Sequence, residues 1–228
     1  MEQNEAIDAA RYLARRRVVQ VCIGLFVLGV ALSMWAYPGG TWWDGARSGH
    51  SFWENFLCDL LHDPALNQMP NRTGSALATA AILIFVVGLG VFWSMAHRWL
   101  DPASTAARWM GGLGVFGAVS LAFVPLTPSN HFPRLHTAAV LMGGLPALTT
   151  FLLFCVSLVR QVRIAAPLRL FTAILGLLVV MGLGLYAQHV ILGGPSLRVL
   201  PLLERLAVIL LLGWMLVLLR LEPENPPR

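Results

Sequence analysis

Residues 18–37 read VVQVCIGLFVLGVALSMWAY, a run of twenty positions without a charged side chain. A helix rises about 1.5 Å per residue, so about 20 apolar residues cross a bilayer core that is about 30 Å thick. Five further stretches are long and apolar enough to do the same: 74–96, 109–126, 137–159, 170–190 and 200–219. The sequence therefore predicts an all-α, polytopic bundle of six transmembrane helices.

The composition of the whole chain agrees with this architecture. Of the 228 residues, 57% are hydrophobic and only 12% are charged, whereas soluble domains average about 45–50% apolar and about 25% charged residues. So few charges cannot cover a water-facing surface. A soluble enzyme, a disordered chain and a disulfide-stapled secreted domain are excluded, and we interpret residues 1–228 as one integral membrane domain.

The arginines predict the orientation of the bundle. All 16 basic residues are arginines. If the N-terminus is cytoplasmic, eleven of them fall in inside segments and five in outside segments: Arg47, Arg72, Arg134, Arg198 and Arg205. This distribution obeys the positive-inside rule. It places both termini in the cytoplasm and the long first loop, 38–73, outside a prokaryotic inner or plasma membrane. It also explains the net charge of +5 without a nucleic-acid partner.

Glycine marks the helices that we expect to pack most closely. The third span, 109–126, is the shortest and carries Gly111, Gly112, Gly114 and Gly117. Small residues let helix backbones approach each other, so this span is predicted to lie inside the bundle. Weaker signals of the same kind are Gly24 with Leu28, Gly88 with Gly90, and Gly182 with Gly184.

The first outer loop contains an amphipathic pattern, SFWENFLCDLLHD, over residues 51–63. At about 100° per residue, the apolar side chains cover one half of a helix, and a polar stripe occupies the other half. The stripe consists of Ser51, Asn55, Asp59 and His62. The pattern predicts a short amphipathic helix that either lies at the interface with its polar side in water or packs over the bundle mouth with this side turned inward.

Other polar residues gather at the same end. Five of the six histidines map to outer segments: His50, His62, His131, His136 and His189. Glu204 and Arg205 lie one turn inside the last span, and charged residues at that depth usually face the bundle and find partners. We expect Arg205 to pair with Asp59, and Glu204 to pair with Arg134 or Arg72.

At these segments the chain resembles a group of six-span prokaryotic membrane proteins, domain of unknown function 998, which is similar in layout to the Frag1/DRAM/Sfk1 membrane proteins. The matching motifs are Asn55-Phe56 with Asp59-Leu60, Asn71, Pro125 and Pro128 before His136, Glu204-Arg205-Leu206, and Trp214 with Arg220. The chain has Leu61 where that group usually has a glycine. The resemblance implies lipid as the associated substrate class.

A second resemblance concerns the residue types at this end. Alkaline ceramidases and adiponectin receptors hold zinc with three histidines beside an aspartate and a serine. His62, His136 and His189, with Asp59 and Ser51, offer the same set. The chain lacks the seventh span and the paired histidines on one helix that those enzymes have.

Two functional hypotheses follow. In the first, the chain is a membrane-embedded hydrolase or acyl-transfer enzyme for a lipid or another apolar substrate. Zinc on His62, His136 and His189 activates a water molecule, with Asp59 and Ser51 as catalytic residues. In the second, the chain is a non-catalytic scaffold or binding subunit, and the outer polar residues are structural. That polar cluster comprises Asn55, Asn71, Arg134, Glu204 and Arg205.

The expected partners are the same for both hypotheses. They are membrane lipid and either a partner membrane protein or a second copy of the chain. A transporter is disfavoured because the two halves of the chain do not repeat and no charged residue lies at mid-span.

Overall fold

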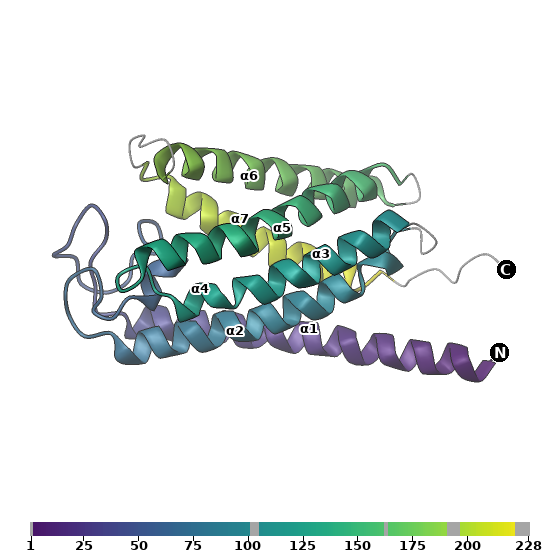
Figure 1. Ribbon diagram of the computed structural model, residues 1–228, viewed down its shortest axis with the longest axis horizontal. Helices are drawn as coiled ribbons and strands as arrows, with labels where there is room; N and C mark the ends of the chain where they lie inside the picture. Colours follow the sequence, from purple (N-terminus) through teal and green to yellow (C-terminus); the bar gives the residue numbers. More distant parts are fainter. Residues whose placement is uncertain (1, 101–104, 162–163, 191–196, 222–228) are drawn as a thin grey trace.

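The computed structural model describes residues 2–100, 105–161, 164–190 and 197–221. Six helices in it are long and apolar enough to cross a membrane, which confirms the all-α six-span architecture (Figure 1). They are α1 (Glu2–Ala36), α2 (Arg72–Ser94), α3 (Thr105–Leu121), α5 (Pro133–Val159), α6 (Ala166–Val190) and α7 (Leu200–Leu218). The short helix α4 (Phe123–Leu126) continues α3 and completes the third span, Thr105–Leu126. Two further short helices lie between spans: η1 (Leu57–Leu61) and η2 (Ala96–Arg98).

The helix α1 is much longer than the predicted span. It has 35 residues and is therefore about 52 Å long, so it extends beyond a bilayer core. Alanine, arginine and glutamate in its first turns favour helix. Tyr12 fixes this extension to the bundle because its hydroxyl donates to the Leu219 carbonyl (3.4 Å) and its ring lies under the Arg98 guanidinium (5.2 Å).

The helices pack in two groups that meet along α5. The helix α1 packs on α2, α2 on α3, and α3 on α5, while α6 lies on the far side of α5 and α7 crosses behind α5 (Figure 1). Through Trp214, α7 contacts both α2 and α5. The helix α3 has the largest buried share of the six spans and α6 the smallest. The glycine-rich third span thus lies between α2 and α5, as its glycines predict, but one of its faces, which carries Trp109 and Phe116, is exposed.

Two glycines explain how α3 comes so close to its neighbours. A Cβ atom at Gly117 would lie 2.8 Å from the Ala147 amide nitrogen on α5, and one at Gly114 would lie 2.5 Å from the Trp93 ring on α2. A larger residue at either position would push the helices apart.

The weaker glycine signals are only partly confirmed. A Cβ at Gly88 would lie 2.6 Å from the Cys22 Cβ, so this glycine does bring α2 close to α1. Gly24 and Gly184 face open space, with nothing within 4 Å of an added Cβ. Among the described residues, neither of these two glycines brings two helices into close contact.

An aromatic cluster forms much of the core. Phe92, Trp93, Phe154 and Trp214 pack with ring centroids 5.4–5.8 Å apart, in edge-to-face and tilted arrangements. The buried Trp214 indole donates to the Thr172 hydroxyl (2.9 Å), so α7 is also tied to α6 by a polar contact.

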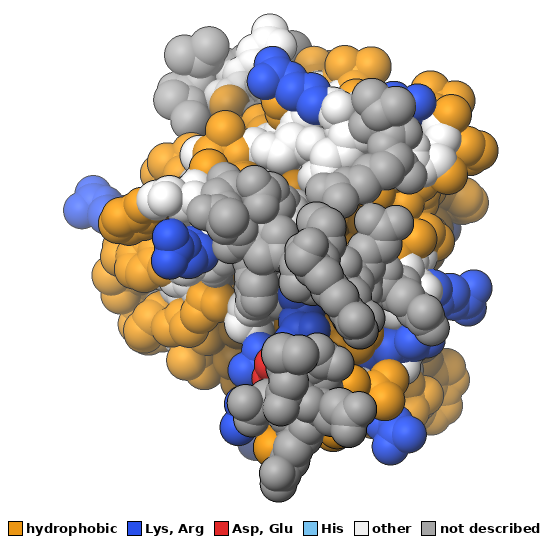
Figure 2. Space-filling model, turned by 90° about the vertical axis from the view of Figure 1, so that its right-hand side faces the viewer, with side chains coloured by type: hydrophobic (Ala, Val, Ile, Leu, Met, Phe, Trp, Pro, Cys, Tyr) orange, Lys and Arg blue, Asp and Glu red, His pale blue; other side chains and the backbone are white. Residues whose placement is uncertain are grey.

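The first turn of α1 and the last turn of α7 lie at the same end of the bundle, which we call the N-terminal end (Figure 1). Figure 2 looks onto this end and shows arginine side chains around its rim. Two of the eleven arginines assigned to inside segments, Arg163 and Arg228, lie outside the described residues. The assignment of this end to the cytoplasm stays a prediction.

Residues 37–71 cover the opposite end of the bundle, and we call this segment the cap. Among the described residues, its regular structure is η1 and an isolated bridge between Gly39 and Ser48. The amphipathic helix predicted over 51–63 is wrong in extent, because only 57–61 is helical and this part is a 3₁₀ helix. The cap brings the predicted site residues to the mouth of the bundle.

Candidate functional site

The beginning of the cap folds into a tight double turn. The Gly40 amide donates to the Arg47 carbonyl (2.8 Å), and the Thr41 hydroxyl accepts the amides of Trp43 and Asp44 (3.3 and 2.9 Å). Gly40 has φ of 88°, a left-handed conformation that glycine adopts without a Cβ penalty. This turn places the Gly40 carbonyl and the Trp42 indole beside the polar stripe of the cap.

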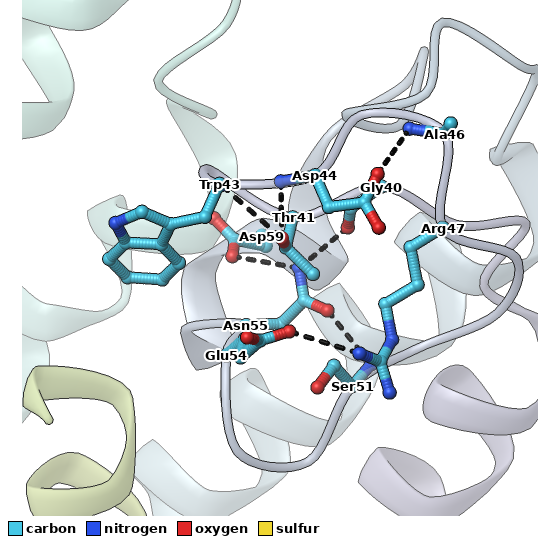
Figure 3. A network of polar contacts seen from close by, with 10 residues as sticks. All are labelled: Gly40, Thr41, Trp43, Asp44, Ala46, Arg47, Ser51, Glu54, Asn55 and Asp59. Carbon is cyan, nitrogen blue, oxygen red and sulfur yellow. Dashed lines mark hydrogen bonds and ion pairs between the residues drawn. The ribbon is translucent and has the colours of Figure 1, made fainter. Parts of the chain in front are cut away.

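Asn55 is the centre of the polar network (Figure 3). Its side chain is completely buried. Its Oδ1 accepts the Ser51 amide (2.9 Å), and its Nδ2 donates to the Gly40 carbonyl (2.9 Å) and to Asp59 Oδ2 (3.2 Å). One amide group thus joins the double turn, the start of the stripe and η1.

These contacts also explain why the predicted helix does not form. Asparagine and aspartate side chains offer the backbone an alternative to helical hydrogen bonds. Here Asn55 bonds the Ser51 amide and Asp59 bonds the Phe56 amide (2.8 Å). The stripe is nevertheless turned inward, since Ser51, Asn55, Asp59 and His62 are all buried. Of the two placements that the sequence left open, the packed one is correct.

Asp59 is held by three N–H donors. Trp42 Nε1 donates to Oδ1 (3.0 Å), while Asn55 Nδ2 and the Phe56 amide donate to Oδ2 (3.2 and 2.8 Å). The residue is only 2% exposed. Burial raises the pKa of Asp59 to about 6, against the opposing effect of these hydrogen bonds. Because both oxygens of the Asp59 carboxylate already accept hydrogen bonds, its surroundings are those of a structural residue.

Arg205 connects this network to α7. Its Nη2 donates to the Asn55 carbonyl (2.9 Å) and to His50 Nε2 (3.3 Å), and its guanidinium lies 5.7 Å from the Phe52 ring centroid. The side chain is 3% exposed. The expected pairing of Arg205 with Asp59 therefore takes an indirect form, in which Asn55 bonds to both residues.

Glu204 supports the cap from the same turn of α7. Its Oε2 accepts the Leu57 amide at the start of η1 (2.9 Å) and lies 3.9 Å from Arg205 Nη1. The expected partners of Glu204 are wrong. Arg72 lies 3.9 Å from Asp63, and Arg134 is exposed on the first turn of α5.

Two histidine contacts hold the cap against the turn between α4 and α5, and a third histidine joins α5 to the same turn. His62 Nε2 lies 2.7 Å from the Ser129 hydroxyl, His131 Nε2 lies 2.8 Å from the Asp63 carbonyl, and His136 Nδ1 lies 2.9 Å from the Thr127 carbonyl. Burial, together with the neighbouring His136 and His131, lowers the pKa of His62 to about 4. His62 is therefore neutral near pH 7.

Asn71 closes the end of the cap where α2 begins. Its buried Nδ2 donates to the carbonyls of Leu60 (3.2 Å) and His62 (2.9 Å), and its amide donates to Asp63 Oδ1 (2.7 Å). Asn71 thus joins η1 to the first turn of α2. This contact supports its assignment to the polar cluster.

The zinc site predicted from the sequence finds no support in the geometry. Within residues 2–100, 105–161, 164–190 and 197–221, no group of three or more His, Cys, Asp or Glu side chains is placed to hold a metal ion. His62 and His136 are bonded to the α4–α5 turn, whereas His189 lies in the last turn of α6. Ser51 contributes its backbone amide to Asn55.

Sequence reasoning missed two members of the site, Trp42 and Ser129. Trp42 supplies the indole donor to Asp59, and Ser129 is the partner of His62. Ser129 lies between Pro128 and Pro133, and the prolines that restrict this turn were the available signal. Trp42 follows the glycine pair of the double turn but carries no pattern of its own.

Comparisons with protein-family models, with curated proteins and with solved structures give no match to this chain. The contacts of the site form a buried network that joins the cap to α7 through Asn55 and Arg205, and to the α4–α5 turn through His62 and Ser129.

Proposed function

We propose that this integral membrane protein is a non-catalytic scaffold or binding subunit whose cap is locked in one conformation. The observation that carries the proposal is the saturation of Asp59 and Asn55. Asp59 accepts three N–H donors, and every polar atom of the Asn55 side chain has a partner. Buried polar groups that are fully bonded rigidify a structure and specify one arrangement.

The position of the lock supports a role in presenting a surface. Arg205 and Glu204 hold the cap from α7, and His62 holds it from the α4–α5 turn. The aromatic side chains of Trp42 and Trp53 remain exposed on the outside of the cap. A fixed cap keeps such groups in a constant geometry for membrane lipid, for a partner membrane protein or for a second copy of the chain.

The experiment measures how fast the cap opens. Cys58 lies within η1, next to Asp59, and is half-buried. Once Cys22 and Cys155 have been replaced by alanine, the rate of its reaction with a maleimide reports how well the cap shields η1. The variant Arg205→Gln removes the charge that holds the Asn55 carbonyl. We expect faster labelling of Cys58 and a lower Tm. The exposed Arg134→Gln, which also lies at this end, is the matched control.

Equal labelling in Arg205→Gln and Arg134→Gln would contradict the lock. So would a cap that opens only on addition of zinc or of a chelator, because the proposed lock is made of protein groups alone. Retention of the helical circular dichroism spectrum separates local opening of the cap from unfolding of the bundle.

One contact favours a second candidate, an acyl-transfer or hydrolytic enzyme for a lipid at the membrane surface. A histidine within hydrogen-bond reach of a serine hydroxyl is the arrangement that activates serine as a nucleophile, and His62 Nε2 lies 2.7 Å from Ser129 Oγ. The resemblance to domain of unknown function 998 is consistent with a lipid substrate.

Labelling with a fluorophosphonate, which modifies activated serines, distinguishes the two candidates. If the protein is a locked scaffold, the wild-type protein and Ser129→Ala should be labelled to the same extent. Labelling of the wild-type protein at Ser129, with loss in both Ser129→Ala and His62→Gln, would replace the scaffold by the enzyme.

A further inference from the structure

A groove lies at the N-terminal end of the bundle, far from the cap. It has a volume of about 340 Å³ and is lined by Ser94 from α2 and by Ala107, Arg108, Gly111, Gly112 and Val115 from α3. This volume is near the lower limit of the roughly 300–1,000 Å³ that small-molecule sites occupy. None of these lining residues belongs to the polar network of the cap. Binding of a ligand in the groove therefore does not depend on the lock.

The groove exists because two consecutive residues of α3 have no side chain. Residues 108, 111, 112 and 115 follow the i, i+3, i+4, i+7 spacing and therefore share one face of the helix. A Cβ at Gly112 would have no atom within 4 Å, so this glycine is not required for packing against another helix. Its effect is to leave an apolar groove that is open at the outer surface of the bundle.

The charge at the mouth of the groove indicates the chemistry of the occupant. Arg108 is exposed one turn before the two glycines, in the first turn of α3. The adjacent Trp109 is 75% exposed, and tryptophan is enriched at the level of lipid headgroups. Arginines also surround this end of the molecule (Figure 2). A cation at headgroup level above an apolar groove complements an anionic amphiphile.

We propose that this groove binds one acyl chain of an anionic phospholipid whose phosphate pairs with Arg108. The guanidinium matches the geometry of phosphate oxygens, and the chain lies along Gly111, Gly112 and Val115. The lipid belongs to the leaflet at the N-terminal end. The site thus selects lipids by their headgroup charge and fixes the position of one chain.

Native mass spectrometry of the detergent-purified protein tests this proposal with dioleoyl phosphatidylglycerol, dioleoyl phosphatidylcholine and glycerol 3-phosphate as separate probes. We expect one phosphatidylglycerol to be retained per chain, with at least tenfold weaker retention of phosphatidylcholine and no retention of glycerol 3-phosphate. Gly112→Leu fills the groove and Arg108→Gln removes the charge. Each is expected to weaken phosphatidylglycerol binding about tenfold, which corresponds to about 1.4 kcal/mol.

Two matched controls separate this site from general lipid contact. Gly184→Leu adds the same side chain at a glycine of α6 that also has nothing within 4 Å of its Cβ, and Arg160→Gln removes an exposed arginine just after α5. Both are expected to bind phosphatidylglycerol like the wild-type protein.

Three results would overturn the proposal. Equal retention of phosphatidylglycerol and phosphatidylcholine removes the headgroup selectivity, and unchanged binding by Gly112→Leu removes the groove. Equal losses in Arg108→Gln and Arg160→Gln assign the effect to the general positive charge of this end. A Tm within a few degrees of wild type verifies that each variant is folded.

Discussion

Replacement of Asn55 by alanine is expected to lower the stability of the protein more than any other single change in the cap. The Ser51 amide and the Gly40 carbonyl, both in buried residues, would lose their side-chain partner. An unsatisfied buried polar group costs about 1–3 kcal/mol, so the two together cost about 4 kcal/mol. In a chain of this size, that loss lowers Tm by roughly 8–16 °C.

Asn55→Asp tests the same contact in a second way. The new carboxylate would keep its bond to the Ser51 amide but would place an acceptor against the Gly40 carbonyl and, at about the present 3.2 Å, against Asp59. Two carboxylates at that distance cannot both be ionised without a large cost. The Tm deficit of this variant should therefore shrink steeply as the pH falls from 8 to 5. The deficit of Asn55→Ala should shrink less, because that variant only removes one donor from the Asp59 carboxylate.

Differential scanning fluorimetry in detergent measures both variants. Asn130→Ala is the control, because Asn130 is exposed and makes a single bond to the Asp63 carbonyl (3.1 Å); its Tm should change by less than about 3 °C. The reasoning fails if Asn55→Ala has the same Tm as this control, or if the Tm deficit of Asn55→Asp does not change with pH.

Three further predictions concern pH, helix packing and metal. Burial lowers the pKa of His50 and of His62 to about 4, with a smaller contribution from Arg205 for His50 and from the other histidines for His62. Because the unfolded chain binds these protons first, the stability that the two neutral histidines contribute is complete above pH 6.5 and is lost toward pH 4. The raised pKa of Asp59 acts in the opposite direction between pH 3.8 and about 6. The Tm of the wild-type protein should therefore fall more between pH 6.5 and pH 4 than the Tm of the double variant His50→Gln, His62→Gln. Gly117→Leu should cost about 1–3 kcal/mol by overpacking against α5, which a lower Tm reports, while Gly184→Leu should have no effect. EDTA should leave Tm unchanged, and a fall of several degrees would restore the metal hypothesis.

The six spans could be predicted from sequence because their signal is local. Twenty apolar residues report the thickness of the bilayer wherever they occur. The inward position of α3 was predicted for the same reason, since the glycines that permit close packing lie within the helix itself. The start of α1 was missed by sixteen residues because its charged first turns are held by a distant contact between Tyr12 and the Leu219 carbonyl.

The sequence indicated which residues gather at the candidate site better than how they are arranged there. The polar stripe of the cap contained Asn55 and Asp59, which the structure brings together in one buried hydrogen-bond network. It did not reveal the Trp42 indole or the Ser129 hydroxyl, since these depend on how two loops meet in space. The grouping of His189 with His62 failed because the sequence did not specify the relative placement of α6 and the cap.

The bond between Arg205 and the Asn55 carbonyl has a consequence for biosynthesis. These residues are 150 positions apart, and ribosomes add about 5–20 residues per second, so α7 is synthesised roughly 8–30 s after the cap. During this interval the nascent cap lacks the cation and the carboxylate that hold it from α7. A chain truncated before α7 would lack both groups permanently, so its cap would be held only by the contacts with the α4–α5 turn.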